Sequence, residues 1–179
     1  MSNPDCPLLG FVAYSGTGKT TLLKKLIPML VEINIRIGII KHAHHEFDID
    51  VPGKDSYELR KAGADQVLVA SSQRWALMVE TSGLDEARLD DLVKQLDRSK
   101  LDLILVEGFK NVHYPKIECH RPSQGHELMC LEDKSIIAIA TDQPLSKQLS
   151  IPQLDLNKPE EIVKFIQDEI LDPQGKRQA

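Results

Sequence analysis

The chain has 179 residues, of which 41% are hydrophobic and 27% charged, and its formal net charge is −5. These values are ordinary for one globular domain, here residues 1–179, and the negative charge provides no basic surface for a nucleic acid. The three cysteines indicate neither a disulfide framework nor a thiolate metal site, and the lack of a secretory leader or a membrane-length apolar run predicts a cytoplasmic protein that binds no membrane.

Short apolar runs rich in Ile, Val and Leu recur along the chain, and several are nearly continuous. Such runs are typical of strands buried on both faces of a parallel sheet. Helical patterns lie between them, so the sequence predicts the α/β class, with a mostly parallel sheet and helices on both faces. The expected strands are Leu8–Ala13, Ile35–Ile40, Gln66–Ala70, Ala76–Val79, Leu101–Val106 and Ile136–Ala140.

Four helices are expected between and after these strands. The first contains Pro28, which removes a backbone hydrogen bond and predicts a kink or a helix in two parts. Gly63 is expected to end the second helix in the left-handed conformation, and the polar tail, residues 173–179, is expected to be flexible. The expected helices are Thr20–Asn34, Gly53–Gly63, Asp85–Asp97 and a last one from Pro159 to about Leu171.

The segment A-Y-S-G-T-G-K-T, residues 13–20, matches the phosphate-loop pattern G-x-x-x-x-G-K-[ST] except at Ala13. Gly16 and Gly18 let successive amides turn inward, Lys19 reaches the β and γ oxygens, and Thr20 can ligate Mg²⁺. The methyl group of Ala13 is tolerable if its φ is negative at the strand end. The alternative, a glycine-rich turn without a ligand, is disfavoured because a strand pattern precedes the segment and a helix pattern follows it.

Residues that follow the strands are further candidates, because ligands bind outside the carboxyl ends of strands in an open parallel sheet. Glu107 ends an apolar strand, as does the acid that holds Mg²⁺ in nucleotide-hydrolysing folds, and Gly108 lets its amide approach a γ-phosphate. Asp142 can accept two hydrogen bonds from guanine but none from the corresponding edge of adenine, which favours GTP. The other candidates are Lys41, His42, His44, His45, Ser71, Ser72 and Thr141.

Two interpretations stay open for the polar stretch after the second expected strand. Its three histidines make polar contacts in a loop or, alternatively, ligate a transition metal. The acidic residues that follow, Asp48, Asp50 and Asp55, form a switch loop over the γ-phosphate and Mg²⁺ or an exposed loop in which Asp55 or Ser56 caps the next helix.

Longer motifs follow the phosphate loop in order: K-H-A-H-H, D-V-P-G-K-D-S-Y-E-L-R-K-A-G-A, S-S-Q-R-W-A-L-M-V-E-T, L-D-L-I-L-V-E-G-F-K and A-T-D-Q-P-L. With these motifs the chain, from Leu8 to about Leu171, closely resembles the MobB family of molybdopterin-guanine dinucleotide biosynthesis adaptor proteins. The resemblance implies a phosphate-loop NTPase fold, GTP and Mg²⁺ as ligands, weak GTP hydrolysis and a homodimer. It also implies a partner, the nucleotidyltransferase MobA, which joins GMP to molybdopterin.

Carried over position by position, the resemblance places a continuous run of residues on phosphate and Mg²⁺. Lys19 of this run is implied as catalytic, together with Glu107. Thr20 and Glu107 are implied as ligands of Mg²⁺. Gly108 would lie beside them, and Asp142 would lie near guanine. The segments 41–45 and 53–56 would face the same cleft. The resemblance assigns no role to 111–134, where we expect the stretch K-I-E-C-H-R to be a strand of a dimerising hairpin. The run consists of Ser15, Gly16, Thr17, Gly18, Lys19, Thr20 and Thr21.

Two other functions fit a phosphate loop. A metallochaperone-type GTPase would use His42, His44 and His45 to insert a metal, and a small-molecule kinase would pass the phosphate to a substrate instead of water. No residue of the sequence identifies itself as the group that positions an attacking water.

Overall fold

The computed structural model describes residues 6–43, 47–81 and 86–172. The chain forms two compact units: a larger unit of Met1–His42 with Leu89–Ala179, and a smaller unit of Ala43–Arg88. The predicted flexible tail, residues 173–179, lies outside the described residues. Among the described helices, none combines the length and the apolar character that crossing a membrane requires.

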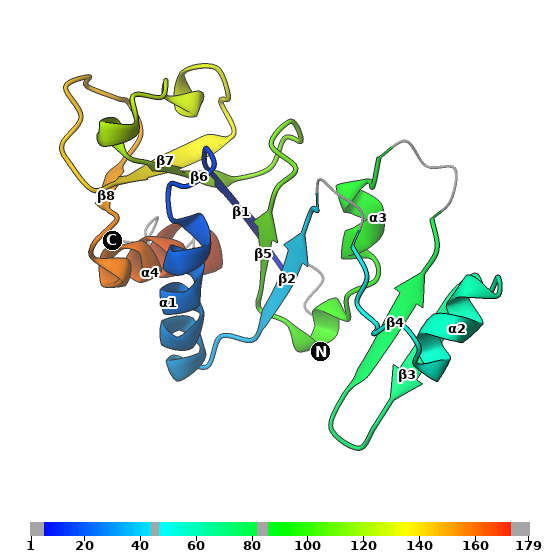
Figure 1. Ribbon diagram of the computed structural model, residues 1–179. Helices are drawn as coiled ribbons and strands as arrows, with labels where there is room; N and C mark the ends of the chain where they lie inside the picture. Colours follow the sequence, from blue (N-terminus) through cyan, green and yellow to red (C-terminus); the bar gives the residue numbers. More distant parts are fainter. Residues whose placement is uncertain (1–5, 44–46, 82–85, 173–179) are drawn as a thin grey trace. The chain divides into compact units, whose positions relative to one another are not determined.

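The larger unit is built on a six-stranded sheet whose strands all run parallel (Figure 1). This arrangement confirms the predicted α/β class, and a parallel sheet places the carboxyl ends of its strands at one common edge. In spatial order the strands are β2 (Ile37–Lys41), β5 (Leu103–Glu107), β1 (Leu8–Val12), β6 (Lys116–His120), β7 (Ile136–Thr141) and β8 (Gln153–Asp155).

Helices cover both faces of this sheet, as predicted. Apolar side chains of α1 (Lys19–Glu32) and α4 (Pro159–Ile166) pack on one face around Phe11 and Leu105, and the two helices lie side by side in Figure 1. The short helix α3 (Leu89–Val93) packs on the other face. A π-helical turn, Gln167–Leu171, extends α4, and 3-10 turns occupy Arg98–Lys100, Pro122–Gln124 and Met129–Leu131.

Two helix predictions need correction. The helix with Pro28 runs unbroken from Lys19 to Glu32, so a helix in two parts is wrong; Pro28 and Lys24 are exposed, and water can satisfy the carbonyl that the proline leaves without a donor. The helix expected over Asp85–Asp97 is much shorter, Leu89–Val93, and is followed by the first 3-10 turn.

Strand β6 corrects the predicted hairpin within 111–134. The stretch K-I-E-C-H is an interior strand, paired in parallel with β1 on one side and β7 on the other. All five of its residues are buried, although three are polar. Partners from the following segment satisfy two of the three, Lys116 and Glu118. Lys116 Nζ donates to Asp133 and Ser135, each at 2.7 Å, and the Glu118 carboxylate accepts the amides of Met129 and Cys130.

The smaller unit consists of α2 (Asp55–Lys61) and the antiparallel pair β3 (Gln66–Ala70) and β4 (Trp75–Val79). The two runs were expected among the strands of the main sheet, but only four residues connect them, and a parallel crossover needs a dozen or more. Ser71 and Ser72 therefore lie in a hairpin turn, closed by the Ser71 amide on the Arg74 carbonyl at 2.8 Å. Gly63 has φ 110° just after α2, as predicted.

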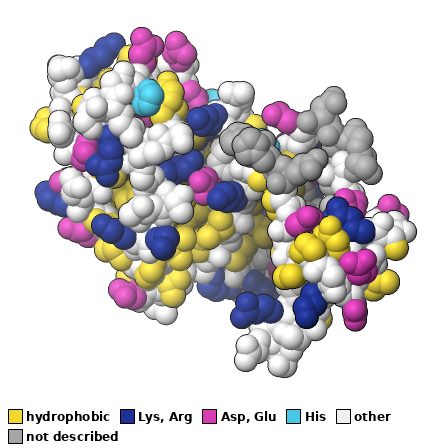
Figure 2. Space-filling view, in the orientation of Figure 1, with side chains coloured by type: hydrophobic (Ala, Val, Ile, Leu, Met, Phe, Trp, Pro, Cys, Tyr) yellow, Lys and Arg dark blue, Asp and Glu magenta, His cyan; other side chains and the backbone are white. Residues whose placement is uncertain are grey.

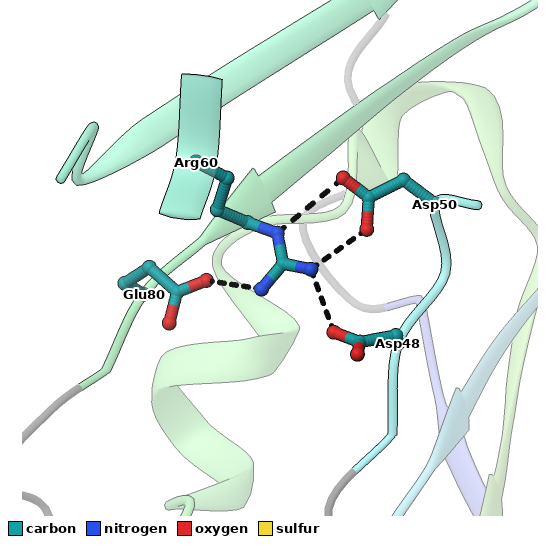
Figure 3. A network of polar contacts seen from close by, with 4 residues as sticks. All are labelled: Asp48, Asp50, Arg60 and Glu80. Atoms are coloured by element: carbon teal, nitrogen blue, oxygen red, sulfur yellow. Dashed lines mark hydrogen bonds and ion pairs between the residues drawn. The ribbon is translucent and has the colours of Figure 1, made fainter. Parts of the chain in front are cut away.

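One arginine ties the parts of the smaller unit together (Figure 3). The guanidinium of Arg60, on α2, lies 2.6 Å from Asp48, 2.7 Å from Asp50 and 2.9 Å from Glu80. Hydrogen bonds from Arg60 hold the pKa of the Asp50 carboxyl below its usual value. Asp48 and Asp50 are thus both paired with Arg60 within this unit. Asp55 is the first residue of α2 and Lys54 is its N-cap, so the expectation that Asp55 or Ser56 caps this helix is wrong.

Candidate functional site

The phosphate-loop segment connects β1 to α1 and has the backbone that its glycines predict. Gly16 and Gly18 have φ values of 80° and 96°, in the left-handed region where side chains are unfavourable. Among the described residues other than glycine, only Asn34 and Phe109 have positive φ, so Ala13 meets the condition under which its methyl group is tolerable. Ala13 is buried in the core under α1, where its methyl group packs.

Helix α1 begins at the end of this loop, at Lys19. Gly18 is its cap residue, and the described first turn carries no acidic side chain and no side-chain cap. First-turn amides of a helix lack partners within the helix and carry its positive dipole end, which favours an anion. Ser15, Thr20 and Thr21 are exposed along this part of the chain.

Lys19 and Glu107 are brought together as a pair. Lys19 Nζ lies 3.4 Å from Glu107 Oε1, with about a fifth of each side chain exposed. Glu107 ends β5, which lies directly beside β1 in the sheet, so the pairing follows from strand order. The lysine predicted to bind phosphate and the carboxylate predicted to hold Mg²⁺ therefore lie next to each other.

The end of β2 closes one side of the site. Lys41 is the register partner of Glu107, and the His42 amide donates to the Glu107 carbonyl at 2.8 Å. Gly108 has φ 98°, and a Cβ there would lie 2.6 Å from the Cβ of His42. Only glycine therefore permits this approach, which is a second reason for Gly108 besides the predicted access to phosphate. The His42 ring stacks on Phe109 with 4.6 Å between ring centroids.

The ends of β6 and β7 close the other side, with residues that the sequence did not single out. Arg121, directly after β6, donates from Nε to the Thr17 carbonyl at 2.8 Å and forms an ion pair with Asp142, which follows β7. The Thr17 hydroxyl lies 3.0 Å from the side-chain oxygen of Gln124. If K-I-E-C-H had been recognised as a strand of the parallel sheet, Arg121 would have been a candidate site residue, because it directly follows the carboxyl end of that strand.

Aromatic rings flank the loop on this side. The rings of Tyr14 and His126 are stacked, with centroids 4.2 Å apart, and the Lys110 ammonium lies 5.7 Å from the Tyr14 centroid. Cys119, on β6, is fully buried, and burial raises the pKa of its thiol to about 12. That thiol stays protonated at neutral pH and is no nucleophile.

The remaining candidates are not gathered here. His44 and His45 lie outside the described residues, and Asp48, Asp50, Asp55, Ser71 and Ser72 belong to the smaller unit. In the part of the chain that the structure describes, no three His, Cys, Asp or Glu side chains are grouped closely enough to hold a metal ion.

A glycine loop between a parallel strand and a helix, with a lysine beside a strand-end acid, defines an α/β protein of the phosphate-loop NTPase type. The family model for MobB, molybdopterin guanine dinucleotide synthesis protein B, matches residues 8–142. The chain belongs to this family.

Relatives and solved structures agree with this assignment. The chain is 56% identical to the molybdopterin-guanine dinucleotide biosynthesis adapter protein of Escherichia coli (strain K12), over 89% of this chain and 91% of that protein. It is 45% identical to the protein of the same name from Haemophilus influenzae, over 93% and 90%. A crystal structure of a MobB homolog from Bacillus stearothermophilus is 26% identical, with a TM-score of 0.65 over 90% and 96% of the two chains. The Bacillus subtilis MobB structure, 23% identical with a TM-score of 0.72, shows the shared fold.

Proposed function

We propose that this chain is a GTP-binding adapter that assists MobA in joining GMP to molybdopterin in the cytoplasm. The observation that carries the proposal is the Lys19–Glu107 pair, 3.4 Å apart, at the mouth of a glycine loop with φ values of 80° and 96°. Family membership supplies the pathway, and an adapter requires partner proteins.

The residues present fit a nucleoside triphosphate with Mg²⁺. The amides at Gly16, Gly18 and the start of α1 would hold the phosphates. Thr20 and Glu107 would hold Mg²⁺, and Lys19 would then leave Glu107 for a phosphate oxygen. Bound Mg²⁺ would neutralise charge on the phosphates. Among the described residues we assign none as the group that positions an attacking water, so we propose only weak GTP hydrolysis.

A preference for guanine is supported by Asp142. Its Oδ2 pairs with Arg121, whereas its Oδ1 is buried and has no hydrogen-bond partner among the described residues. A buried carboxylate oxygen without a donor is costly, and the N1 and N2 hydrogens of guanine would supply one if the atoms that cover Oδ1 move aside when the base binds. Adenine carries no N–H donor at the corresponding positions, N1 and C2.

A homodimer is supported by the hairpin of the smaller unit. One face of this hairpin carries four exposed large apolar residues, from 42% exposed for Leu77 to 68% for Trp75: Leu68, Trp75, Leu77 and Val79. Yellow side chains are visible on the surface of this unit in Figure 2. Exposed apolar patches of this kind mark protein interfaces, and an unpaired strand edge invites pairing. We propose that the hairpin takes part in the contact between two copies.

The proposal is tested by titrating GTP and ATP with Mg²⁺ into the purified protein, with and without MobA, while following affinity and phosphate release. We expect tighter binding of GTP than of ATP, slow release of phosphate, and a change in either quantity when MobA is added. Equal affinity for both nucleotides together with no effect of MobA would contradict the proposal. Nucleotide consumption that depends on a small-molecule acceptor would indicate a kinase, and metal retained after dialysis would indicate a metallochaperone.

A further inference from the structure

We propose that Arg121 is a positioning residue that couples guanine recognition to the phosphate loop, by holding Thr17 of the loop and Asp142 at the base-binding end with one guanidinium. The inference rests on the proposed function, because it concerns the same nucleotide site. It goes beyond that function by assigning the residue through which the two halves of the site act together.

Arg121 joins three elements that are far apart in sequence. It follows β6, its Nε donates to the carbonyl of Thr17 at 2.8 Å, and its Nη1 pairs with Asp142 Oδ2. Thr17 lies between β1 and α1, and Asp142 follows β7. Since β6 lies between β1 and β7 in the sheet, its carboxyl end is the position from which one side chain can reach both.

The contact with Thr17 acts on the phosphate loop itself. The Thr17 carbonyl belongs to the same peptide unit as the amide of Gly18, so a cation on the oxygen polarises the N–H at the other end. Arg121 also lies against Gly18, since a Cβ built there would be 3.6 Å from Nη2. The guanidinium therefore fixes the orientation of a peptide unit at the amino end of α1, where phosphate would bind.

The contact with Asp142 orients the carboxylate. A guanidinium is planar and rigid, and it restricts the rotation of a carboxylate that it pairs with. The Asp142 side chain is 15% exposed, and its free Oδ1 keeps its place while Oδ2 is held. Without Arg121 the carboxylate would be free to rotate, and the donors of guanine would meet it in several orientations.

The segment that carries Arg121 is itself fastened to the loop. The Gln124 amide donates to the Arg121 carbonyl at 3.0 Å, which closes the turn between them. The Gln124 side chain meets the buried Thr17 hydroxyl at 3.0 Å, and that hydroxyl also lies 2.8 Å from the Tyr14 carbonyl. Arg121 is thus held on a braced turn, as a positioning residue must be.

The test compares Arg121→Gln with Asp142→Asn, using GTP, ATP and inorganic tripolyphosphate as probes of the intact chain. Tripolyphosphate reports on the loop alone, and the ratio of GTP to ATP affinity reports on the base. We expect Asp142→Asn to lower the ratio and to change tripolyphosphate affinity much less than Arg121→Gln does, because Arg121 keeps its hydrogen bond to the Thr17 carbonyl. Arg121→Gln should weaken the binding of tripolyphosphate about tenfold, as expected when a hydrogen bond from a charged group is lost. It should also lower the ratio of GTP to ATP affinity as far as Asp142→Asn does.

A double variant, one control variant and one replacement variant complete the experiment. Arg121→Gln made in the Asp142→Asn background should lower the ratio no further, because the two residues act as a unit. The control is Arg36→Gln, which breaks another Arg–Asp pair, Arg36 with Asp102 at 2.7 Å. These two residues lie just before the amino ends of β2 and β5, so this variant should change neither the affinity for tripolyphosphate nor the ratio of GTP to ATP affinity. If Arg121→Gln does not fold, as judged by circular dichroism, Arg121→Lys serves instead, since one ammonium cannot make both contacts in the same geometry.

The outcomes separate the two proposals. A parent protein that binds neither GTP nor tripolyphosphate contradicts the proposed function. A parent that prefers GTP, with Arg121 variants that keep the parental ratio, contradicts the inference alone, and so does a fall in the ratio without any loss of tripolyphosphate affinity.

Discussion

Strands β5 and β4 have similar apolar sequences, L-I-L-V-E and W-A-L-M-V, but opposite surroundings. In the larger unit, the first four residues of β5 are buried between two layers of helices. In the smaller unit, β4 is exposed at four of its five positions. An apolar run therefore indicates a strand, whereas its burial is decided by the layers around it. The buried sheet gives rigid strand ends for a binding site, and the exposed pair offers a surface for association.

The largest expected difference between β5 and β4 is in how much each strand contributes to stability. Leu105 on β5 is 2% exposed and Leu77 on β4 is 42% exposed. We expect Leu105→Ala to lower the free energy of unfolding by about 3 kcal/mol, because it leaves a cavity, and Leu77→Ala to lower it by less than about 1 kcal/mol. Urea unfolding, at protein concentrations below the dimer dissociation constant, measures both. Equal losses would show that the hairpin face is buried in solution.

Nucleotide binding should depend on the larger unit. Lys19→Ala should weaken GTP binding about a hundredfold, because charge-assisted hydrogen bonds to phosphate are lost. Isothermal titration calorimetry measures the affinity, and urea unfolding checks that the fold persists. Lys24→Ala is the matched control, since Lys24 is an exposed lysine farther along α1. If Lys19→Ala bound GTP like the parent, the assignment of the phosphate loop would be wrong.

Association should depend on the smaller unit. Trp75→Ser removes the most exposed aromatic side chain of the hairpin, at 68%, and should raise the dimer dissociation constant about tenfold or more if this residue is an interface anchor. Sedimentation velocity over a concentration series measures the constant. Val31→Ser on α1, where Val31 is 56% exposed, should leave it unchanged. The reverse pattern would place the interface on the larger unit.

The smallest expected effects concern two aspartates, one in each unit. Hydrogen bonds from Arg36 lower the pKa of Asp102 to about 2, and those from Arg60 lower the pKa of Asp50. Arg36→Gln and Arg60→Gln should raise these pKa values toward ~3.9, as NMR titration of each carboxyl would measure. The stability that each pair contributes is present above ~3.9 and is lost as pH falls through the folded pKa. A pKa that stays low in a variant would show that another group depresses it.

Much of the site was predictable because its signals are local. The phosphate loop lies within one strand-loop-helix segment, and Glu107 directly follows its strand, so spacing alone identified both. Their meeting, 3.4 Å apart, followed from the rule that parallel strands end at one edge. The guanine role of Asp142 stays a prediction.

The stretch of β6 was expected to be a strand, but its interior place in the parallel sheet was missed for a physical reason. Its alternating polar residues are typical of a half-exposed strand, yet Lys116 and Glu118 are buried with partners 11 to 19 residues away. The link from Arg121 to Thr17 spans 104 residues. Such partners are supplied by the packed chain, and no local pattern contains them.

By itself, the sequence determined the fold class, the phosphate loop and its glycine conformations, because backbone preferences and apolar periodicity act over a few residues. Only the tertiary structure decided which strands lie inside, which apolar faces stay exposed, and that one arginine reaches both the loop and Asp142. These are contacts between residues far apart in the chain, and they form only when the strands take their order in the sheet.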